Sequence, residues 1–304
     1  MRIALAGTPQ IAVPTLEWLL TSDHELVRVF TTSPKAAGRG GHIVKSDVAR
    51  WCEQKSIDCI EIAKTDDFQA NLDDIDCVIV IAFGILLPQD ILDQPTHGFI
   101  NLHFSELPRW RGAAPVQRAI EHGDTHLGIT VFSLDAGMDT GPTFRSATRE
   151  RDPQMRTSEV LEYLATEGVT LIKDSLADIS AGVVPIVQGS VGASIASKIG
   201  KDEALLDWNL NADVLQRKIL AFYPNPIART FFRGDLLKIT NAVLSTTYEE
   251  KLEPGELHVS KNTVLIGTSD GILEILSVIP QGKSEMKAAD WARGARIDLG
   301  EYFG

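Results

Sequence analysis

The sequence predicts an α/β protein with two domains, in which a mostly parallel open sheet comes first and a smaller β-barrel follows. Short β-branched runs alternate with helical patterns in the first half of the chain, as in parallel βαβ units. Beyond residue 205, short strand-like runs follow one another between turn residues. The chain has 304 residues, more than one domain usually contains. We therefore predict a first domain over 1–190, a linker over 191–204 and a second domain over 205–304.

Four strands are expected in the first third of the chain. Two of them are almost continuously hydrophobic, which is typical of strands whose two faces are both covered by helices. This pattern indicates a central, Rossmann-like sheet. The expected strands are Arg2 to Ala6, Glu25 to Thr31, Cys77 to Ala82 and Gly98 to His103.

Helices fit between these strands and after them. Pro115 stands at the first position of one helix and Gly123 just past its end, the preferred places for these two residues. A longer helix is predicted by apolar residues at near-helical spacing, and Gly182 ends it. The expected helices are Val13 to Leu20, Ser46 to Lys55, Pro115 to His122 and Ser158 to Ala181.

The pattern changes after Gly182. Residues 183–205 lack clear periodicity, and one amphipathic helix is expected from Ala212 to Phe222, before Pro224. Turns at Gly234-Asp235 and Asp270-Gly271 separate short strands, which predicts a small OB-like barrel. The expected strands are Ala228 to Phe232, Leu236 to Ile239, Thr263 to Gly267 and Ile272 to Ile279.

Composition excludes several classes of protein. The longest apolar run, Val78 to Leu87, is too short for the roughly 20 residues that cross a bilayer, and the N-terminus lacks a signal-peptide core. We expect a cytoplasmic protein with no membrane partner. The net charge of −12 argues against a broad nucleic-acid binder. The three cysteines have no CxxC spacing, so neither a disulfide framework nor a metal site is expected.

A candidate site begins at Asn101 and His103, at the end of a predicted strand. Side chains alternate along a strand, so both residues point to the same face. Ligands of open α/β sheets bind beyond the carboxyl ends of the strands. An amide N–H and an imidazolium placed there can stabilise the negative charge on a carbonyl oxygen that an amine attacks.

Asp139 is the candidate partner of His103. It lies in the glycine-rich segment Asp135 to Pro142, after a strand expected from Ile129 to Leu134. A carboxylate near His103 would raise the pKa of the imidazole and could relay the proton that leaves an amine. Each feature is weak by itself, because a strand-end Asn and His are often structural and an Asp in a turn usually bonds its own backbone.

The segment from Asn101 to Pro115, with Met138 to Pro142 downstream, resembles the folate-dependent formyltransferases. The resemblance covers nearly the whole chain and includes Ala6 to Pro9 and Lys198 to Glu203. It implies that Asn101, His103 and Asp139 are catalytic, in a formyltransferase domain over 1–190. The chain departs from the family pattern at Phe104, Glu106, Ile195 and Leu205.

The resemblance also implies the substrates. The donor would be 10-formyltetrahydrofolate, bound near Ile85, Leu86 and Leu87 and near Ser105 and Pro108. The acceptor would be initiator methionyl-tRNA, approached by a basic, glycine-rich loop and by the second domain as a tRNA-binding barrel. We expect a monomer without a metal. The loop residues implied are Lys35, Arg39, His42 and Lys45.

Two alternatives remain open at this point. The acceptor could instead be an amino-sugar nucleotide or water, since relatives within the family use these. The chain could also be a binding module or a dinucleotide enzyme, although the turn Gly7-Thr8-Pro9 lacks the GxGxxG pattern. A calcium site at Asp139 is disfavoured, because the other ligands of a calcium loop are missing around it.

Overall fold

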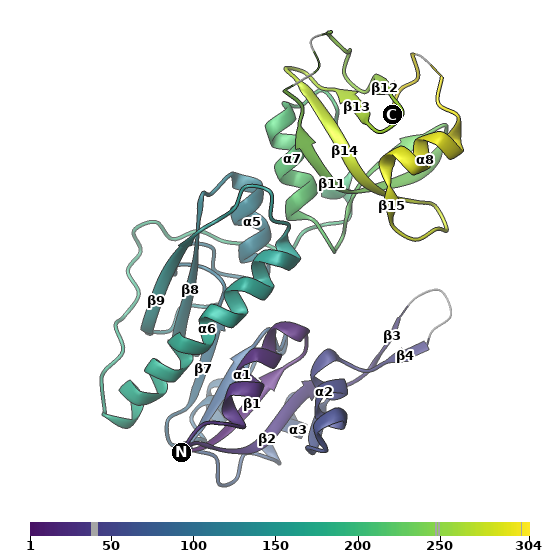
Figure 1. Ribbon diagram of the computed structural model, residues 1–304. Coiled ribbons are helices and arrows are strands. Elements are labelled where there is room, and N and C mark those ends of the chain that lie inside the picture. The colour runs from purple at the N-terminus through teal and green to yellow at the C-terminus, as the bar shows by residue number, and fades with distance from the viewer. Residues whose placement is uncertain (38–41, 247, 249, 299) are drawn as a thin grey trace. The chain divides into compact units, whose positions relative to one another are not determined.

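The computed structural model describes residues 1–37, 42–246, 248, 250–298 and 300–304 (Figure 1). Within these residues the chain forms two compact units, and neither is continuous in sequence. The domain bounds 1–190, 191–204 and 205–304 therefore stay a prediction. Unit 1 contains Met1–Gly112, Leu127–Arg149 and Leu161–Ile195, and unit 2 contains Ala113–His126, Glu150–Val160 and Ala196–Gly304.

Unit 1 is built on a sheet of seven strands in the order β5-β2-β1-β6-β7-β8-β9. The first five strands of this order are paired in parallel, and β8 is antiparallel to β7. The order reverses direction between β1 and β6, so the crevice for a ligand is expected at the carboxyl ends of the central strands. The strands are β1 (Arg2–Gly7), β2 (Glu25–Thr32), β5 (Cys59–Ile62), β6 (Cys77–Ile81), β7 (Phe99–His103), β8 (His126–Ser133) and β9 (Thr143–Glu150).

The central strands are buried on both faces, as their continuous hydrophobic runs predict. On one face, Val78 and Val80 of β6 join a core in which the rings of Phe30 and Phe68 stack 4.3 Å apart. On the other face, alternate residues such as Ile79 are equally inaccessible to solvent. The mostly parallel, Rossmann-like sheet is thus confirmed.

Each predicted helix begins and ends within one residue of its predicted bounds. Ser46 caps the second helix, because its hydroxyl accepts a hydrogen bond of 3.0 Å from the amide of Ala49. Two short helices, α3 and α4, and a hairpin of β3 (Lys35–Ala37) and β4 (His42–Val44) were not predicted. The helices are η1 (Gln10–Ala12), α1 (Val13–Leu19), α2 (Asp47–Lys55), α3 (Thr65–Gln69), α4 (Gln89–Leu92) and α6 (Thr157–Ser180).

Helix α6 packs closely against β7, the strand that carries the candidate site. A Cβ on Gly168 of α6 would lie 2.7 Å from Leu102 Cδ2, so α6 approaches β7 closely at this glycine. Leu102 alternates with Asn101 and His103 along β7, and it therefore points to the opposite face. Among the described residues, no helix is long and apolar enough to span a membrane.

Unit 2 contains an antiparallel sheet in the order β10-β11-β14-β13-β12, with β15 paired to β14. Arg233 and Gly234, both with positive φ, form the tight turn between the first two strands. The elements are α5 (Pro115–His122), η2 (Asp202–Ala204), α7 (Ala212–Ala221), β10 (Ala228–Phe232), β11 (Asp235–Leu244), β12 (Leu257–Val259), β13 (Val264–Gly267), β14 (Ile272–Pro280), β15 (Met286–Lys287) and α8 (Ala288–Ala295).

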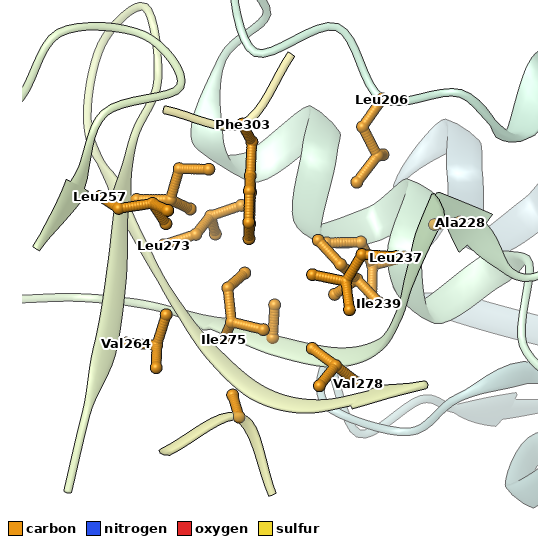
Figure 2. Close-up of a cluster of buried hydrophobic side chains, with 14 of the residues drawn as sticks. Leu206, Ala228, Leu237, Ile239, Leu257, Val264, Leu273, Ile275, Val278 and Phe303 are labelled. Carbon is orange, nitrogen blue, oxygen red and sulfur yellow. The ribbon is translucent and has the colours of Figure 1, made fainter. Parts of the chain in front are cut away.

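The core of unit 2 lies between this sheet and its helices. Figure 2 shows Leu237, Ile239, Leu273, Ile275 and Phe303 pointing toward one another from separate strands and from the C-terminal segment. The spacing of short strands and turns predicted a small OB-like barrel in this part of the chain, and the structure has an antiparallel sheet there. The strands β12 and β15 were missed because they have only three and two residues, too few to show a period. The helix α8 was not predicted either.

Candidate active site

The candidate site lies at the carboxyl end of β7. Asn101 pairs in register with Val80 of β6 and with Phe132 of β8, and His103 pairs with Thr130. The alternation of β7 places Asn101 and His103 on the face that also carries Phe99, as the sequence predicted. Asn101 is half-buried and His103 is buried, so a ligand at this edge would meet both in a largely dry setting.

His103 is held by one hydrogen bond and faces one carboxylate. Its Nε2 lies 2.9 Å from the carbonyl oxygen of Trp110, and its Nδ1 lies 3.8 Å from Oδ2 of Asp139. A carbonyl oxygen only accepts, so Nε2 carries the hydrogen and donates it. In the neutral ring, Nδ1 is then the unprotonated nitrogen, and it points toward Asp139.

Burial lowers the pKa of His103, while the charge of Asp139 and the Trp110 carbonyl oppose this shift and raise it. The effect of Asp139 has the expected sign, but the loss of hydration outweighs it because the ring is almost fully enclosed.

Asp139 lies in the loop between β8 and β9. Its Oδ2 accepts a hydrogen bond of 2.7 Å from the amide of Gly112, and its backbone is left-handed, with φ of 55°. Asp135 ties the same loop together, because its carboxylate accepts hydrogen bonds from Thr140 Oγ1 and from the amide of Gly137. A Cβ on Gly141 would lie 1.8 Å from the carbonyl oxygen of Ser133, so the loop requires glycine there.

The loop after β7 folds back onto β8. Thr130 Oγ1 donates to the carbonyl oxygen of Ser105 at 2.8 Å and accepts from the amide of Leu107 at 3.2 Å. A Cβ on Gly128 would lie 2.1 Å from the backbone nitrogen of Glu106, so glycine permits this approach. Phe104, where the family usually has a small residue, is buried.

The predicted folate contacts divide into two groups. Ile85, Leu86 and Leu87 lie in the loop after β6, next to the reversal of strand order. Leu86 is 82% exposed, whereas the other two residues pack partly against the core. Ser105 is buried, and its hydroxyl donates to the Arg109 carbonyl oxygen at 2.6 Å. Pro108 follows a cis peptide bond. As contacts of a folate, all five residues stay predictions.

The predicted tRNA contacts lie around the β3–β4 hairpin. Lys35 begins β3 and His42 begins β4, while Arg39 lies outside the described residues. Lys45 follows β4 and forms an ion pair with Glu53 of α2, and this hydrogen bond raises the pKa of the lysine.

Sequence reasoning missed two groups of the site. The first is the loop backbone, in which the Trp110 carbonyl and the Gly112 amide hold His103 and Asp139. The second is Gln188, whose side chain bonds the Asp139 loop and Arg111. Residues 183–195 show no periodicity, so the sequence carried no signal for Gln188. Among the described residues there is no group of three or more His, Cys, Asp or Glu side chains that could hold a metal ion.

Known proteins resemble this chain over both of its parts. The family model described as "Formyl transferase" matches residues 1–172, and "Formyl transferase, C-terminal domain" matches residues 198–296. The chain is 43% identical to a methionyl-tRNA formyltransferase of Thermobifida fusca, covering 100% of this chain and 99% of the relative. A second relative of the same name, from Streptomyces griseus, is 42% identical over 100% of both chains.

Solved structures share the fold. HypX from Aquifex aeolicus in complex with tetrahydrofolic acid superposes with a TM-score of 0.73 at 19% identity, over 99% of this chain and 48% of HypX. Methionyl-tRNA formyltransferase from Clostridium thermocellum gives a TM-score of 0.60 at 15% identity, over 82% of this chain and 95% of that protein. The matches over the full length establish that this chain belongs to the formyl transferase family, in the branch of the methionyl-tRNA formyltransferases.

Proposed function

We propose that this chain transfers the formyl group of 10-formyltetrahydrofolate to the α-amino group of methionyl initiator tRNA. The observation that carries the proposal is the pair of His103 and Asp139, 3.8 Å apart, beside Asn101 on the same face of β7. Relatives at 43% and 42% identity are named for this acceptor. That favours methionyl-tRNA over an amino-sugar nucleotide or water.

Asn101 and His103 act on the oxygen of the formyl group. As the amine forms its bond to the formyl carbon, the carbonyl electrons move to this oxygen, and the Asn101 amide and His103 Nδ1 donate hydrogen bonds to it. Nδ1 carries no proton before the reaction, because Nε2 is the protonated nitrogen. His103 therefore has to gain a proton while the negative charge develops, which restricts its strongest interaction to the transition state.

Asp139 supplies the route for that proton. Its carboxylate accepts a proton from the attacking amine and passes it to Nδ1 of His103, which becomes an imidazolium. When the bond between the formyl carbon and the donor nitrogen breaks, the carbonyl forms again and the donor nitrogen takes up the proton from this pair. The net result is one C–N bond formed, one broken and one proton moved, with no covalent bond to the enzyme.

The donor would sit at the carboxyl ends of β6 and β7. Backbone groups of Ile85, Leu86 and Leu87 can bond the polar edge of a pterin, and the exposed Leu86 side chain offers it an apolar surface. Ser105 and Pro108 would contribute through the loop backbone, since the Ser105 hydroxyl is already bonded to Arg109.

The acceptor would be held by basic residues. We assign Lys35, Arg39, His42 and Lys45 to the end of the tRNA that carries methionine, and the predicted domain over 205–304 to binding the rest of it. Basic side chains contact phosphates, and glycines allow the backbone of a loop to approach closely.

The test is a formylation assay with 10-formyltetrahydrofolate and methionyl initiator tRNA. We expect His103→Ala and Asp139→Asn each to lower kcat by about 100-fold or more, since a donor to an oxyanion is worth about 10²–10³ and a group that transfers a proton about 10²–10⁴. His97→Ala, which removes an exposed imidazole, is the control. Near-normal turnover of either variant would sink the catalytic assignment, and preference of the wild type for an amino-sugar nucleotide or for water would sink the acceptor.

A further inference from the structure

An extended segment of unit 1, residues 183–195, lies beside both loops of the candidate site; we call it the strap. Ile186 exchanges two backbone hydrogen bonds of 2.8 Å with Thr143, at the start of β9. Most of the strap is open to solvent, and the apolar side chains of Val187 and Val191 are 81% and 92% exposed. Gln188 is half-buried between exposed neighbours. Burial of apolar surface therefore does not explain why the Gln188 side chain is covered.

Gln188 uses all of its hydrogen-bonding capacity on the site. Its Nε2 donates to the carbonyl oxygens of Asp139, at 3.0 Å, and of Gly141, at 2.7 Å. Its Oε1 accepts from Arg111, at 2.7 Å from Nη2 and 3.1 Å from Nε. One amide therefore joins the loop that carries Asp139 to the loop that carries Gly112.

The chemistry of the partners fixes the orientation of this amide. Carbonyl oxygens only accept and a guanidinium only donates, so the reversed amide would face four mismatched contacts. A glutamate of the same shape would keep the pairing with Arg111, but it would place a carboxylate against two carbonyl oxygens. An amide therefore fits this position, whereas another polar side chain of the same shape does not.

Asp139 needs this support because its backbone is left-handed, with φ of 55°. For a residue with a side chain this conformation costs about 1–2 kcal/mol and persists only where surrounding contacts hold it. Gln188 holds the Asp139 carbonyl, while the Gly112 amide holds the carboxylate at 2.7 Å. Loss of the Gln188 contacts would leave Asp139 attached through its side chain alone.

The strap also holds the other partner of His103. Ser194 Oγ accepts from the amide of Trp110 at 2.9 Å, and the carbonyl of Trp110 in turn accepts from His103 Nε2. The carbonyl oxygen of Ser194 accepts from the amide of Arg111 at 2.9 Å. Both groups that face the imidazole nitrogens are therefore tied to the strap.

We propose that Gln188 is a positioning residue of the formyl transfer, which acts by holding the backbone of Asp139 so that its carboxylate faces Nδ1 of His103. The inference rests on the proposed function, because it presumes that Asp139 moves a proton. Gln188 contacts the backbone of the Asp139 loop and the Arg111 side chain rather than the predicted substrate positions, so its loss acts on kcat and leaves substrate binding nearly unchanged.

The experiment is a double-mutant cycle between Gln188→Met and Asp139→Asn, measured as kcat and KM with methionyl-tRNA. We expect Gln188→Met alone to lower kcat by about 10- to 100-fold, since a displacement of about 1 Å can cost 10²-fold. KM should change by less than about twofold. In the Asp139→Asn background the same substitution should cost little more, because residues that act as one unit are not additive.

Two further variants keep the test independent of folding. Gln188→Glu retains the Arg111 pairing and should still lose activity, whereas Gln69→Glu makes the same chemical change at an exposed position and should not. Full activity of Gln188→Met, or losses that multiply in the double variant, would overturn the inference and leave the function standing. Full activity of Asp139→Asn alone would overturn the function, and the inference with it.

Discussion

His103 is an almost fully enclosed imidazole with one nitrogen bonded to a carbonyl and the other facing a carboxylate. In the proposed mechanism the ring is neutral until negative charge develops beside it. A histidine that is charged at rest would bind the ground state and the transition state alike, which lowers KM without raising kcat. The lowered pKa of His103, caused by burial and opposed by Asp139, is thus compatible with catalysis.

The same group makes the stability of the fold depend on pH. Because burial lowers the pKa of His103 in the folded chain, the unfolded chain, with a pKa of about 6.5, binds a proton that the folded one does not. The contribution is fully present above about pH 6.5 and is lost as the pH falls toward the folded value. His103→Gln should therefore lose less stability than the wild type between pH 7.5 and 5.5.

Urea unfolding at a series of pH values measures this difference. His97→Gln removes an exposed imidazole and serves as the comparison. Parallel pH profiles for the wild type and His103→Gln would contradict the assignment of a buried neutral histidine.

At the scale of elements, helix α6 approaches strand β7 closely at a glycine of the helix, Gly168. A Cβ on Gly168 would lie 2.7 Å from Leu102 Cδ2, on the strand that carries Asn101 and His103. Gly294, in α8, has no heavy atom within 4 Å of the same position. The same substitution should therefore have opposite effects in the two helices.

We expect Gly168→Ala to destabilise the protein by about 1–3 kcal/mol through overpacking. Gly294→Ala should stabilise it by up to about 1 kcal/mol, because alanine loses less backbone entropy in a helix. Denaturant unfolding of the two variants gives both values. Equal signs for the two changes would show that the contact of α6 with β7 is looser than the structure has it.

The sequence predicted the elements whose own residues show a hydrophobic pattern. It missed elements whose conformation depends on partners far away in the sequence. The strands β1, β2, β6 and β7 lie within a residue or two of their predicted bounds, because continuous apolar runs occur where both faces are covered. Strand β9 was missed because it lies at the edge of the sheet, where its residues are mostly polar and partly exposed, so no hydrophobic run marks it in the sequence. The strap was also missed, because its conformation comes from Thr143, Trp110 and Arg111 rather than from its own residues.

The candidate site was foreseen to a similar extent. Strand alternation put Asn101 and His103 on one face, and the family resemblance added Asp139. The left-handed backbone of Asp139 and the burial that lowers the pKa of His103 depend on the folded loops, so the sequence showed neither. Gln188 had no motif of its own.

At the scale of the whole molecule, a net charge of −12 opposes the approach of a polyanion. Under the proposed function, binding of tRNA would depend on local groups of basic residues, such as those assigned to the β3–β4 hairpin and its flanks. Lys45 is one of them, and it is already paired with Glu53. We expect Lys45→Met to lower the slope of log Kd against log salt by about 0.7–0.9, the share of one phosphate contact.

Titration of tRNA binding between low and moderate salt gives this slope. Lys64→Met, which removes a surface lysine at the start of α3, is the matched control and should leave the slope unchanged. An unchanged slope for Lys45→Met would remove this lysine from the proposed acceptor contacts.

The strap limits how this chain can be cut and recombined. A fragment that ends at residue 172, where the first family model stops, would lack both Gln188 and Ser194, and one that ends at residue 190 would lack Ser194. A hybrid enzyme that keeps this catalytic half should therefore be joined after Ile195, where unit 1 ends. The strap has no pattern in the sequence and could be taken for a spacer, but an insertion or deletion within it would disturb the contacts of Gln188 and Ser194. A hybrid enzyme therefore has to contain the whole strap.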